Sequence, residues 1–489
     1  MADDRPFASR VARAFAFSGV GNIFAKGMFF VSLLIVLRLM DTADFGVASI
    51  VLAVFAITEA FNELGLGVAL IQRKETSREE IDALFWISMG LSTFIYVVIL
   101  LGAPLLASFY DQQQLTPLLR VYGLILIMFP FYFISRNLLM KELAFGKLAV
   151  ADNLSLASAS VTMIVLGYHG YGPWAIIAGD LVHRFGRLVF YNAFHPYFPR
   201  FRTSFSRIGG MVRFGIYVTG SRLLYNFYIH ADYLIVGKVF GAEVLGIYTL
   251  AYRIVSDPVK TLAMITNQVA YPAFSTLQND TERLRRYFYT ITRFTMMIIG
   301  TILLVIAVFV DWLLEIGGYD QYMGAVSLVR ILAFVGLVRC VAPLVPQLLN
   351  AVDKAKLNFM YSLATAVVMP VAFLVGAQFS FTGVAVSWVV AYPFVVLVLF
   401  AFGARILDVK LPFFVIKSFS GILRLLPIAL VVVFLRLVLD GLYQSMPYAA
   451  VGGAVLSSLV FGAGVVLLTE RKTFKTVFRR GNADENRES

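Results

Sequence analysis

Long apolar stretches separated by short polar breaks run from one end of the chain to the other. A hydrocarbon core about 30 Å thick is crossed by about 20 mostly apolar helical residues. The pattern predicts fourteen such stretches, at residues 14–37, 45–70, 84–108, 116–138, 147–167, 172–194, 211–236, 244–272, 288–312, 323–349, 357–376, 382–404, 414–436 and 447–469. We therefore expect an all-α integral membrane protein with 14 transmembrane helices.

Composition and charge agree with this class and add an orientation. Hydrophobic residues make up 60% of the 489 residues and charged residues 14%, whereas soluble domains have roughly 45–50% and 25%. A soluble, disordered or nucleic-acid-binding protein is therefore disfavoured. In alternate loops, 28 of the 41 Lys and Arg residues fall on one side and 3 on the other. Because basic loops stay in the cytoplasm, we predict that both termini are cytoplasmic.

The two halves of the chain are related by an internal repeat. After a shift of 200 residues, Gly46 coincides with Gly246; further along, a shift of 210 aligns Arg120 with Arg330. Each repeat spans six predicted helices, and an even number gives both halves the same orientation in the membrane. The predicted domains are an N-terminal six-helix bundle at 1–200, a C-terminal six-helix bundle at 201–410, helices 13 and 14 at 411–470, and a basic cytoplasmic tail at 471–489.

Ionisable residues inside the predicted spans are the candidate functional positions. A charge at the centre of a membrane helix costs about 2.5–3.5 kcal/mol on insertion. Most of these side chains are therefore expected to face a wet cavity, an interface or an opposite charge. They are Lys26, Glu59, Glu63, Asp152, Asp180, His183, Arg184, Arg187, Arg222, His230, Arg253, Asp257, Lys260 and Arg339. Many are three or four residues apart, which places them on one helix face.

Polar pairs at matching positions relate the first and seventh spans. After the shift of 200 residues, Asn22 and Lys26 coincide with Arg222 and Asn226. We therefore expect these two spans to face each other across a cavity between the halves. Other sets have structural alternatives, namely a salt-bridge ladder of Arg253, Asp257 and Lys260, extension of Arg184 and Arg187 to the cytoplasmic interface, and pairing of Glu59 and Glu63 with basic loops.

Signatures of catalysis and metal binding are absent from the sequence. It contains no G-x-x-x-x-G-K-[ST] phosphate loop, zinc signature or nucleophile elbow. The single cysteine, Cys340, excludes an internal disulfide and a thiolate cluster. We expect no catalytic residue, no metal site and no cofactor, and therefore a protein that is not an enzyme.

Short motifs around the seventh and eighth spans resemble those of a known family. Residues 231–238, ADYLIVGK, and residues 245–248, LGIY, are similar to its D-x-x-[IL]-[IVL]-G and G-x-Y patterns. Phe45-Gly46 and residues 63–67, ELGLG, resemble its L-x-x-F-G and [DE]-x-G-[LF] patterns. The chain thus resembles the polysaccharide transporter (Wzx-type flippase) family of the multidrug/oligosaccharidyl-lipid/polysaccharide exporter superfamily, with most similarity to a colanic-acid-exporter-like subgroup.

This resemblance implies a transport function. The expected substrate is an undecaprenyl-pyrophosphate-linked oligosaccharide for exopolysaccharide or O-antigen synthesis, carried across the bacterial inner membrane by alternating access of a cationic central cavity. Expected partners are this lipid-linked oligosaccharide, a coupling ion (proton or sodium), and the polysaccharide polymerase and chain-length machinery, with no nucleic acid. From the helix stripes we assign substrate binding to Lys26, Arg222, Arg253 and Arg339, and ion coupling to Glu59, Glu63 and Asp257.

Two other functions are weighed against this one. A multidrug or cation antiporter of the same superfamily is expected to have an acidic cavity and twelve helices. A membrane polysaccharide polymerase or ligase needs a sizeable outer loop that carries catalytic residues, whereas the predicted outer loops are short. The basic interior and the last two spans favour the flippase.

Overall fold

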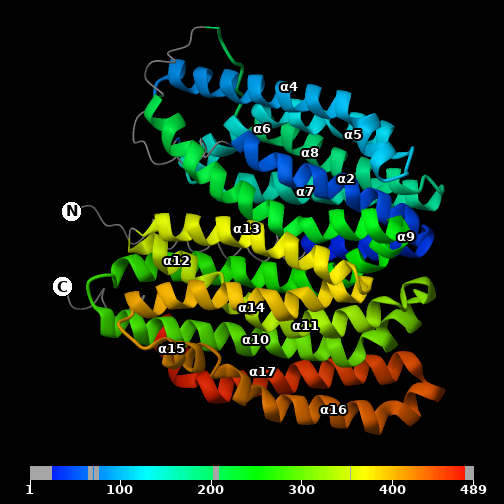
Figure 1. The fold of residues 1–489 in the computed structure, drawn as a ribbon, viewed down its shortest axis with the longest axis vertical. Coiled ribbons are helices and arrows are strands. Elements are labelled where there is room, and N and C mark those ends of the chain that lie inside the picture. The colour runs from blue at the N-terminus through cyan, green and yellow to red at the C-terminus, as the bar shows by residue number, and fades with distance from the viewer. Residues whose placement is uncertain (1–24, 64–69, 71–75, 202–208, 353, 480–489) are drawn as a thin grey trace. The chain divides into compact units, whose positions relative to one another are not determined.

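The computed structural model describes residues 25–63, 70, 76–201, 209–352 and 354–479, which are almost entirely helical. The chain divides into two compact units, residues 1–246 and 247–489. The division falls inside the longest helix, α9 (Gly209–Thr276). There Gly241, with φ 84° and ψ 174°, interrupts the helical backbone, a conformation that glycine adopts without a side-chain clash. In Figure 1 the helices within each unit run side by side.

The first unit is built around α8. Its helices are the segment 25–39, α2 (Thr42–Glu63), α4 (Arg78–Phe109), α5 (Leu115–Tyr122), α6 (Leu124–Lys141), α7 (Phe145–Tyr168), α8 (Pro173–Phe194) and the first part of α9. α8 packs against α7, α6, α5 and α2. Ser77 caps α4, because its side chain accepts a hydrogen bond from the Glu80 amide while Glu80 accepts one from the Ser77 amide. The central position of α8 makes its polar residues interior to the bundle.

The second unit is built around α10. After the rest of α9 it contains α10 (Thr281–Gly317), the short η2 (Asp320–Tyr322), α11 (Ala325–Val341), α12 (Leu344–Ala351), α13 (Ala355–Ala377), α14 (Phe381–Ile406), α15 (Leu411–Ser418), α16 (Gly421–Ser445) and α17 (Pro447–Arg479). α10 packs against α11, α16 and α17, and α14 packs against α13 and α11. The last two long helices are therefore attached to this unit through α10.

The number of transmembrane helices agrees with the prediction. Eleven segments in the described part of the chain are long and apolar enough to cross a membrane. One of them lies within α9 and covers parts of two predicted spans, one on each side of Gly241. α8 covers a further predicted span, although Asp180, Arg184 and Arg187 make it more polar. The helix at 25–39 is the described part of the first span. The described residues thus contain helices at all 14 predicted spans.

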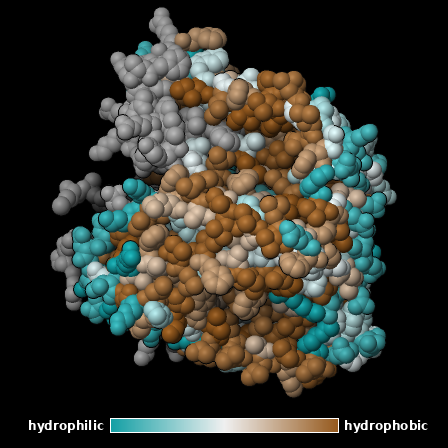
Figure 2. All heavy atoms as spheres, viewed as in Figure 1, coloured by the Kyte–Doolittle hydropathy of each residue, from teal (hydrophilic) through white to brown (hydrophobic). Residues whose placement is uncertain are grey.

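The molecular surface is that of a membrane protein. Apolar side chains cover the middle of the helices, and hydrophilic ones gather at the helix ends (Figure 2). On α16, Leu430 and Leu437 are 73% and 71% exposed. Contiguous exposed apolar surface of this kind faces hydrocarbon rather than water.

The internal repeat is visible in the helix boundaries. Helices α5 and α6 occupy residues 115–141, and α11 and α12 occupy residues 325–351, an offset of 210 at both ends. The paired arginines also make the same contact. The Nε of Arg120 donates to the Leu100 carbonyl at 3.4 Å, and that of Arg330 donates to the Ala307 carbonyl at 3.2 Å. The sequence repeat is therefore a structural repeat.

Two glycines of the repeat allow a close helix crossing. A Cβ atom on Gly46 would lie 1.8 Å from the Ala242 carbonyl oxygen, and one on Gly246 would lie 2.0 Å from the Thr42 carbonyl oxygen. Both separations are far shorter than any real carbon–oxygen contact. Thr42 and Ala242 are also 200 residues apart, so the crossing between the start of α2 and the second part of α9 is symmetric.

The packing and the sequence repeat divide the chain at different places. The first part of α9 contacts the first unit, since the Tyr110 hydroxyl donates to the Leu234 carbonyl at 3.3 Å and Lys238 lies 3.5 Å from Asp111. The bundle boundaries at residues 200 and 410 describe the repeat and stay a prediction.

Candidate functional site

An ionic network occupies the interior of the first unit. Arg184 of α8 forms an ion pair with Glu59 of α2. Its Nε also lies 2.7 Å from the Asp180 carboxylate one turn earlier on α8. The hydroxyl of Tyr122 on α5 donates a hydrogen bond to the same Asp180 oxygen. Only 17% of the Arg184 side chain is exposed, so one guanidinium neutralises two largely covered carboxylates.

A second pair extends the network along α8. The Nε of Arg187 donates to Asp152 of α7 at 2.9 Å, and the Tyr191 hydroxyl donates to the same Asp152 oxygen at 2.7 Å. The His183 ring lies 3.9 Å from Asp180. Three carboxylates, those of Glu59, Asp152 and Asp180, thus face two arginines, so the carboxylates outnumber the arginines by one.

The positions of Arg184 and Arg187 correct one sequence interpretation. Neither side chain extends to the cytoplasmic interface; each is paired inside the bundle. Glu59 likewise pairs with α8 rather than with a basic loop. Apart from Asp180, one turn before Arg184 on α8, the partners of these arginines lie on other helices, 35 residues or more away in the chain, so helical spacing could not reveal them. The Glu63 side chain lies outside the described residues.

In the second unit, Arg339 of α11 lies between two aromatic rings. Its guanidinium carbon is 5.0 Å from the ring centre of Tyr252 on α9 and 4.8 Å from that of Trp388 on α14. Its Nη1 donates to the Ser256 hydroxyl at 3.3 Å. The two rings are buried, with exposed fractions of 2% and 0%. A cation over desolvated rings gains about 2 kcal/mol, so these neighbours stabilise the charge and fix its orientation.

A further cation borders this group. The Lys260 ammonium lies 5.8 Å from the Tyr252 ring centre. Tyr252, Ser256 and Lys260 are four residues apart along α9, which places them on one helix face. The structure therefore gathers two cations and two aromatic rings from three helices. Sequence reasoning had selected Arg339 but missed Trp388 and Tyr252, since nothing in their local spacing marks them.

The other predicted site residues are divided between the units. Lys26 and Arg222 lie in the first unit with exposed side chains, and Arg253 and Asp257 lie in the second with half-buried side chains. The assignment of all four stays a prediction. Among the described residues, no three His, Cys, Asp or Glu side chains form a group that could hold a metal ion.

A family model matches more than half of the chain. The family model described as "Polysaccharide biosynthesis protein" matches residues 35–327. The chain is 27% identical over 365 residues to the lipopolysaccharide biosynthesis protein WzxC of Escherichia coli (strain K12), covering 74% of each chain. It is 23% identical over 486 residues to the succinoglycan biosynthesis transport protein ExoT of Rhizobium meliloti (strain 1021), covering 98% of this chain and 97% of that one.

Solved structures share the fold. A lipid II flippase, MurJ, in an inward closed conformation is similar with a TM-score of 0.66 and 12% identity, covering 94% of this chain and 99% of that one. An inward-facing multidrug resistance MATE family transporter of the MOP superfamily is similar with a TM-score of 0.55 and 16% identity, covering 82% and 94%. At these identities the likeness concerns the fold alone.

Proposed function

We propose that the chain is a flippase for a lipid-linked oligosaccharide. It belongs to the polysaccharide biosynthesis protein family. The relatives compared above are named as biosynthesis and transport proteins and not as enzymes. The substrate we propose is an undecaprenyl-pyrophosphate-linked oligosaccharide at the bacterial inner membrane. Its sugars are polar and its pyrophosphate is anionic, and neither crosses hydrocarbon unaided. The protein's task is to shelter this head group while the lipid tail stays in the bilayer.

Arg339 carries the proposal. It is a permanently charged group in the middle of a transmembrane segment, and buried aromatic rings on two other helices hold it in place. A planar guanidinium binds phosphate oxygens through two parallel hydrogen bonds. The chain keeps this costly cation in the membrane, which supports an anionic substrate over the cationic drugs of a multidrug antiporter.

The remaining cations complete the proposed binding chamber. Lys26, Arg222 and Arg253 line it together with Arg339, and the chamber opens alternately to the cytoplasm and the periplasm. The parallel repeat supports this mechanism, since transporters built from two similar bundles move one bundle against the other around a central site. Both termini are cytoplasmic, as the distribution of basic loops indicates.

The ionic network of the first unit is the proposed coupling site. Its three carboxylates and two arginines leave one negative charge, which a proton or a sodium ion can neutralise. Glu59 lies at the edge of this group with 34% of its side chain exposed, so an ion can reach it more readily than it can reach Asp180. Glu63 and Asp257 remain further coupling candidates.

Removing a substrate-binding cation should reduce surface polysaccharide. A hydrogen bond to a charged group contributes about 1.5–3 kcal/mol, or about ten- to a hundredfold in binding. We expect Lys26→Ala, Arg222→Ala and Arg339→Ala each to lower polymer output by this order while the protein still reaches the membrane. The measurement is cell-surface polysaccharide normalised to membrane-inserted protein.

Exposed cations at helix ends serve as the matched controls. Arg405, in the last turn of α14, and Lys410, just before α15, lie outside the proposed chamber and are exposed. Arg405→Ala and Lys410→Ala should leave polymer output unchanged. Normal output in all three chamber variants would contradict the cationic-chamber proposal.

Ion coupling can be tested separately. In vesicles that contain the lipid-linked substrate, a proton or sodium gradient should accelerate translocation by the unchanged protein. We expect Glu59→Gln to remove this acceleration but keep the basal rate, because Arg184 and Asp180 remain paired. Glu243→Gln, at an exposed carboxylate on α9, is the control. A Glu59→Gln protein that still responds fully to both gradients would rule out Glu59 as the coupling residue.

A further inference from the structure

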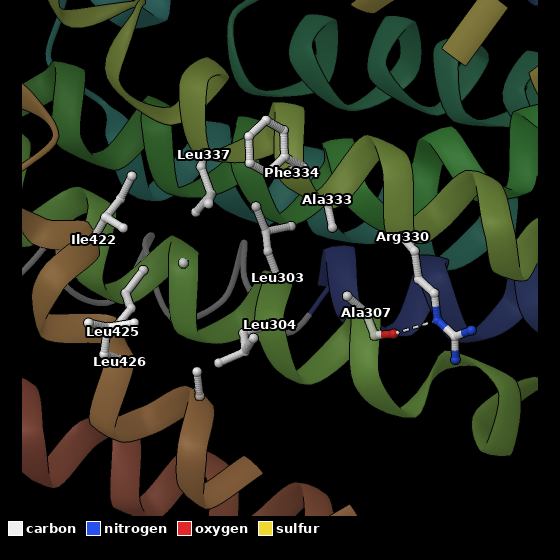
Figure 3. Close-up of a pocket in the computed structure, with 12 residues that line it drawn as sticks. Leu303, Leu304, Ala307, Arg330, Ala333, Phe334, Leu337, Ile422, Leu425 and Leu426 are labelled. Atoms are coloured by element: carbon white, nitrogen blue, oxygen red, sulfur yellow. Dashed lines mark hydrogen bonds between the residues drawn. The ribbon is translucent and has the colours of Figure 1, made fainter. Parts of the chain in front are cut away.

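An apolar pocket opens on the second unit between α10, α11 and α16. Its volume is about 270 Å³. Eleven of its twelve lining residues are apolar, and the twelfth is Arg330 at one end. Figure 3 shows leucine side chains from the three helices pointing toward the space and Arg330 at its edge, bonded to the Ala307 carbonyl.

Hydrocarbon is the natural occupant of this pocket. All three of its helices belong to membrane-crossing segments, and the lining side chains Phe334 and Leu426 are 60% and 55% exposed. Water has almost no hydrogen-bond partner on such a lining, and an empty space forfeits dispersion contacts. Pockets that enclose whole small molecules usually measure roughly 300–1,000 Å³. A smaller, open pocket fits a segment of one acyl chain.

Two arginines lie at the polar end of the pocket. Arg436 of α16 lies 2.9 Å from the Asp311 carboxylate, and Arg330 lies 3.4 Å from the same oxygen. Arg436 is the closer and the more covered, with 24% of its side chain exposed against 50% for Arg330. Two arginines therefore share one carboxylate, and Arg330 is the accessible cation.

Aromatic residues place this polar end at a membrane surface. The Trp312 ring stacks on Tyr443 with ring centres 4.4 Å apart, and the Arg436 guanidinium carbon lies 3.7 Å from the Trp312 ring centre. The Tyr443 hydroxyl donates to Glu315 at 2.7 Å. The Trp312 side chain is buried, but Tyr443 lies two residues before the end of α16, and α10 ends five residues after Trp312. This polar end therefore lies near the helix ends, where Tyr is enriched because hydrocarbon meets head groups there. Arg330 is thus at the depth where a phospholipid carries its phosphate.

We propose that this pocket binds an anionic phospholipid, with a segment of one acyl chain between α10, α11 and α16 and the phosphate on Arg330. The exposed guanidinium of Arg330 selects a head group with one net negative charge, as in phosphatidylglycerol, over a neutral one. The bound lipid completes the packing of α16 against α10 and α11. This inference needs only the membrane location of the protein and does not depend on its substrate.

The repeat supplies a matched control. Arg120 occupies the equivalent position in the first unit and makes the same bond to a carbonyl of the preceding helix. The first unit has no counterpart of α16, because α16 follows both repeats. Arg120→Gln therefore removes the same type of side chain and the same contact in a unit that lacks a counterpart of α16.

The experiment measures lipid binding to the full-length, delipidated protein by native mass spectrometry. The probes are phosphatidylglycerol and phosphatidylcholine with identical acyl chains. We expect one preferred phosphatidylglycerol on the unchanged protein. In Arg330→Gln this binding should weaken about fivefold, while Arg120→Gln should bind as before. Ala429→Leu and Ala307→Leu, which fill the pocket from two different helices, should lose the preferred site for both lipids.

Two results would overturn the proposal: equal binding to the Arg330→Gln and Arg120→Gln proteins, or undiminished binding to both pocket-filling variants. Undecaprenyl phosphate is a third probe. If undecaprenyl phosphate occupies the pocket at a lower concentration than phosphatidylglycerol does, the pocket is a site for a prenyl chain and the assignment to phospholipid is wrong. Melting curves recorded without added lipid identify a pocket-filling variant that fails to fold. In that case lipid binding to the other pocket-filling variant tests the proposal.

Discussion

Arg184→Met is expected to destabilise the protein strongly and to lower the yield of folded protein. The substitution leaves Glu59 and Asp180 without the guanidinium that pairs with both. Breaking a buried ion pair by deleting one partner costs about 3–5 kcal/mol, against a total stability of about 5–15 kcal/mol. The measurements are the yield of monodisperse protein after detergent extraction and its melting temperature.

A charge-neutral combination distinguishes this explanation from lost packing. In Glu59→Gln/Asp180→Asn/Arg184→Met, no charge of the triad remains, while amide oxygens can still accept hydrogen bonds such as the one from Tyr122. Replacing a whole buried ion cluster is often close to neutral in stability, so we expect this protein to regain most of its yield. If the single variant is as stable as the unchanged protein, the network contributes little to folding.

Gly46→Ala should destabilise the protein, although alanine is the better helix former. The new Cβ would meet the Ala242 carbonyl oxygen at 1.8 Å, and backbone cannot move aside as a flexible side chain can. Overpacking of this kind costs about 1–3 kcal/mol, and we expect at least this loss here. Gly246→Ala, with 2.0 Å to the Thr42 oxygen, should behave alike.

The control for this prediction is a glycine at which substitution by alanine should stabilise the protein. Gly102, in α4, has nothing within 4 Å of an added Cβ, so Gly102→Ala should stabilise the helix by roughly 1 kcal/mol. Melting temperatures of the three variants under the same conditions measure the contrast. Equal shifts for Gly46→Ala and Gly102→Ala would mean that the crossing is looser than described.

The fold was largely predictable from the sequence because its determinants are local. The length of each apolar stretch sets a membrane crossing, and repeated positions such as Arg120 and Arg330 establish the relation between the halves. The predicted spans at 211–236 and 244–272 correspond to the two parts of α9. The kink between them could not be foreseen, since it depends on the backbone conformation of one residue, Gly241.

The candidate site was predictable only in part. Intramembrane charges such as Glu59 and Arg339 stand out in an apolar sequence, because each is costly to insert. Their partners do not: Arg184 lies 125 residues after Glu59, and Trp388 lies 49 residues after Arg339. Which face of one helix meets which face of another depends on the rotation of the packed helices. Arg184 was therefore expected at an interface and is instead inside the bundle.

The glycine crossing also limits which residues positions 46 and 246 can hold. Gly46 accommodates the backbone at Ala242, and Gly246 accommodates the backbone at Thr42, so position i of one copy meets position j of the other and the reverse. This is the geometry of an isologous dimer interface. In a dimer of identical copies, one glycine would supply both contacts. In this chain each half needs its own glycine, because a larger residue at either position would displace the backbone of the other half.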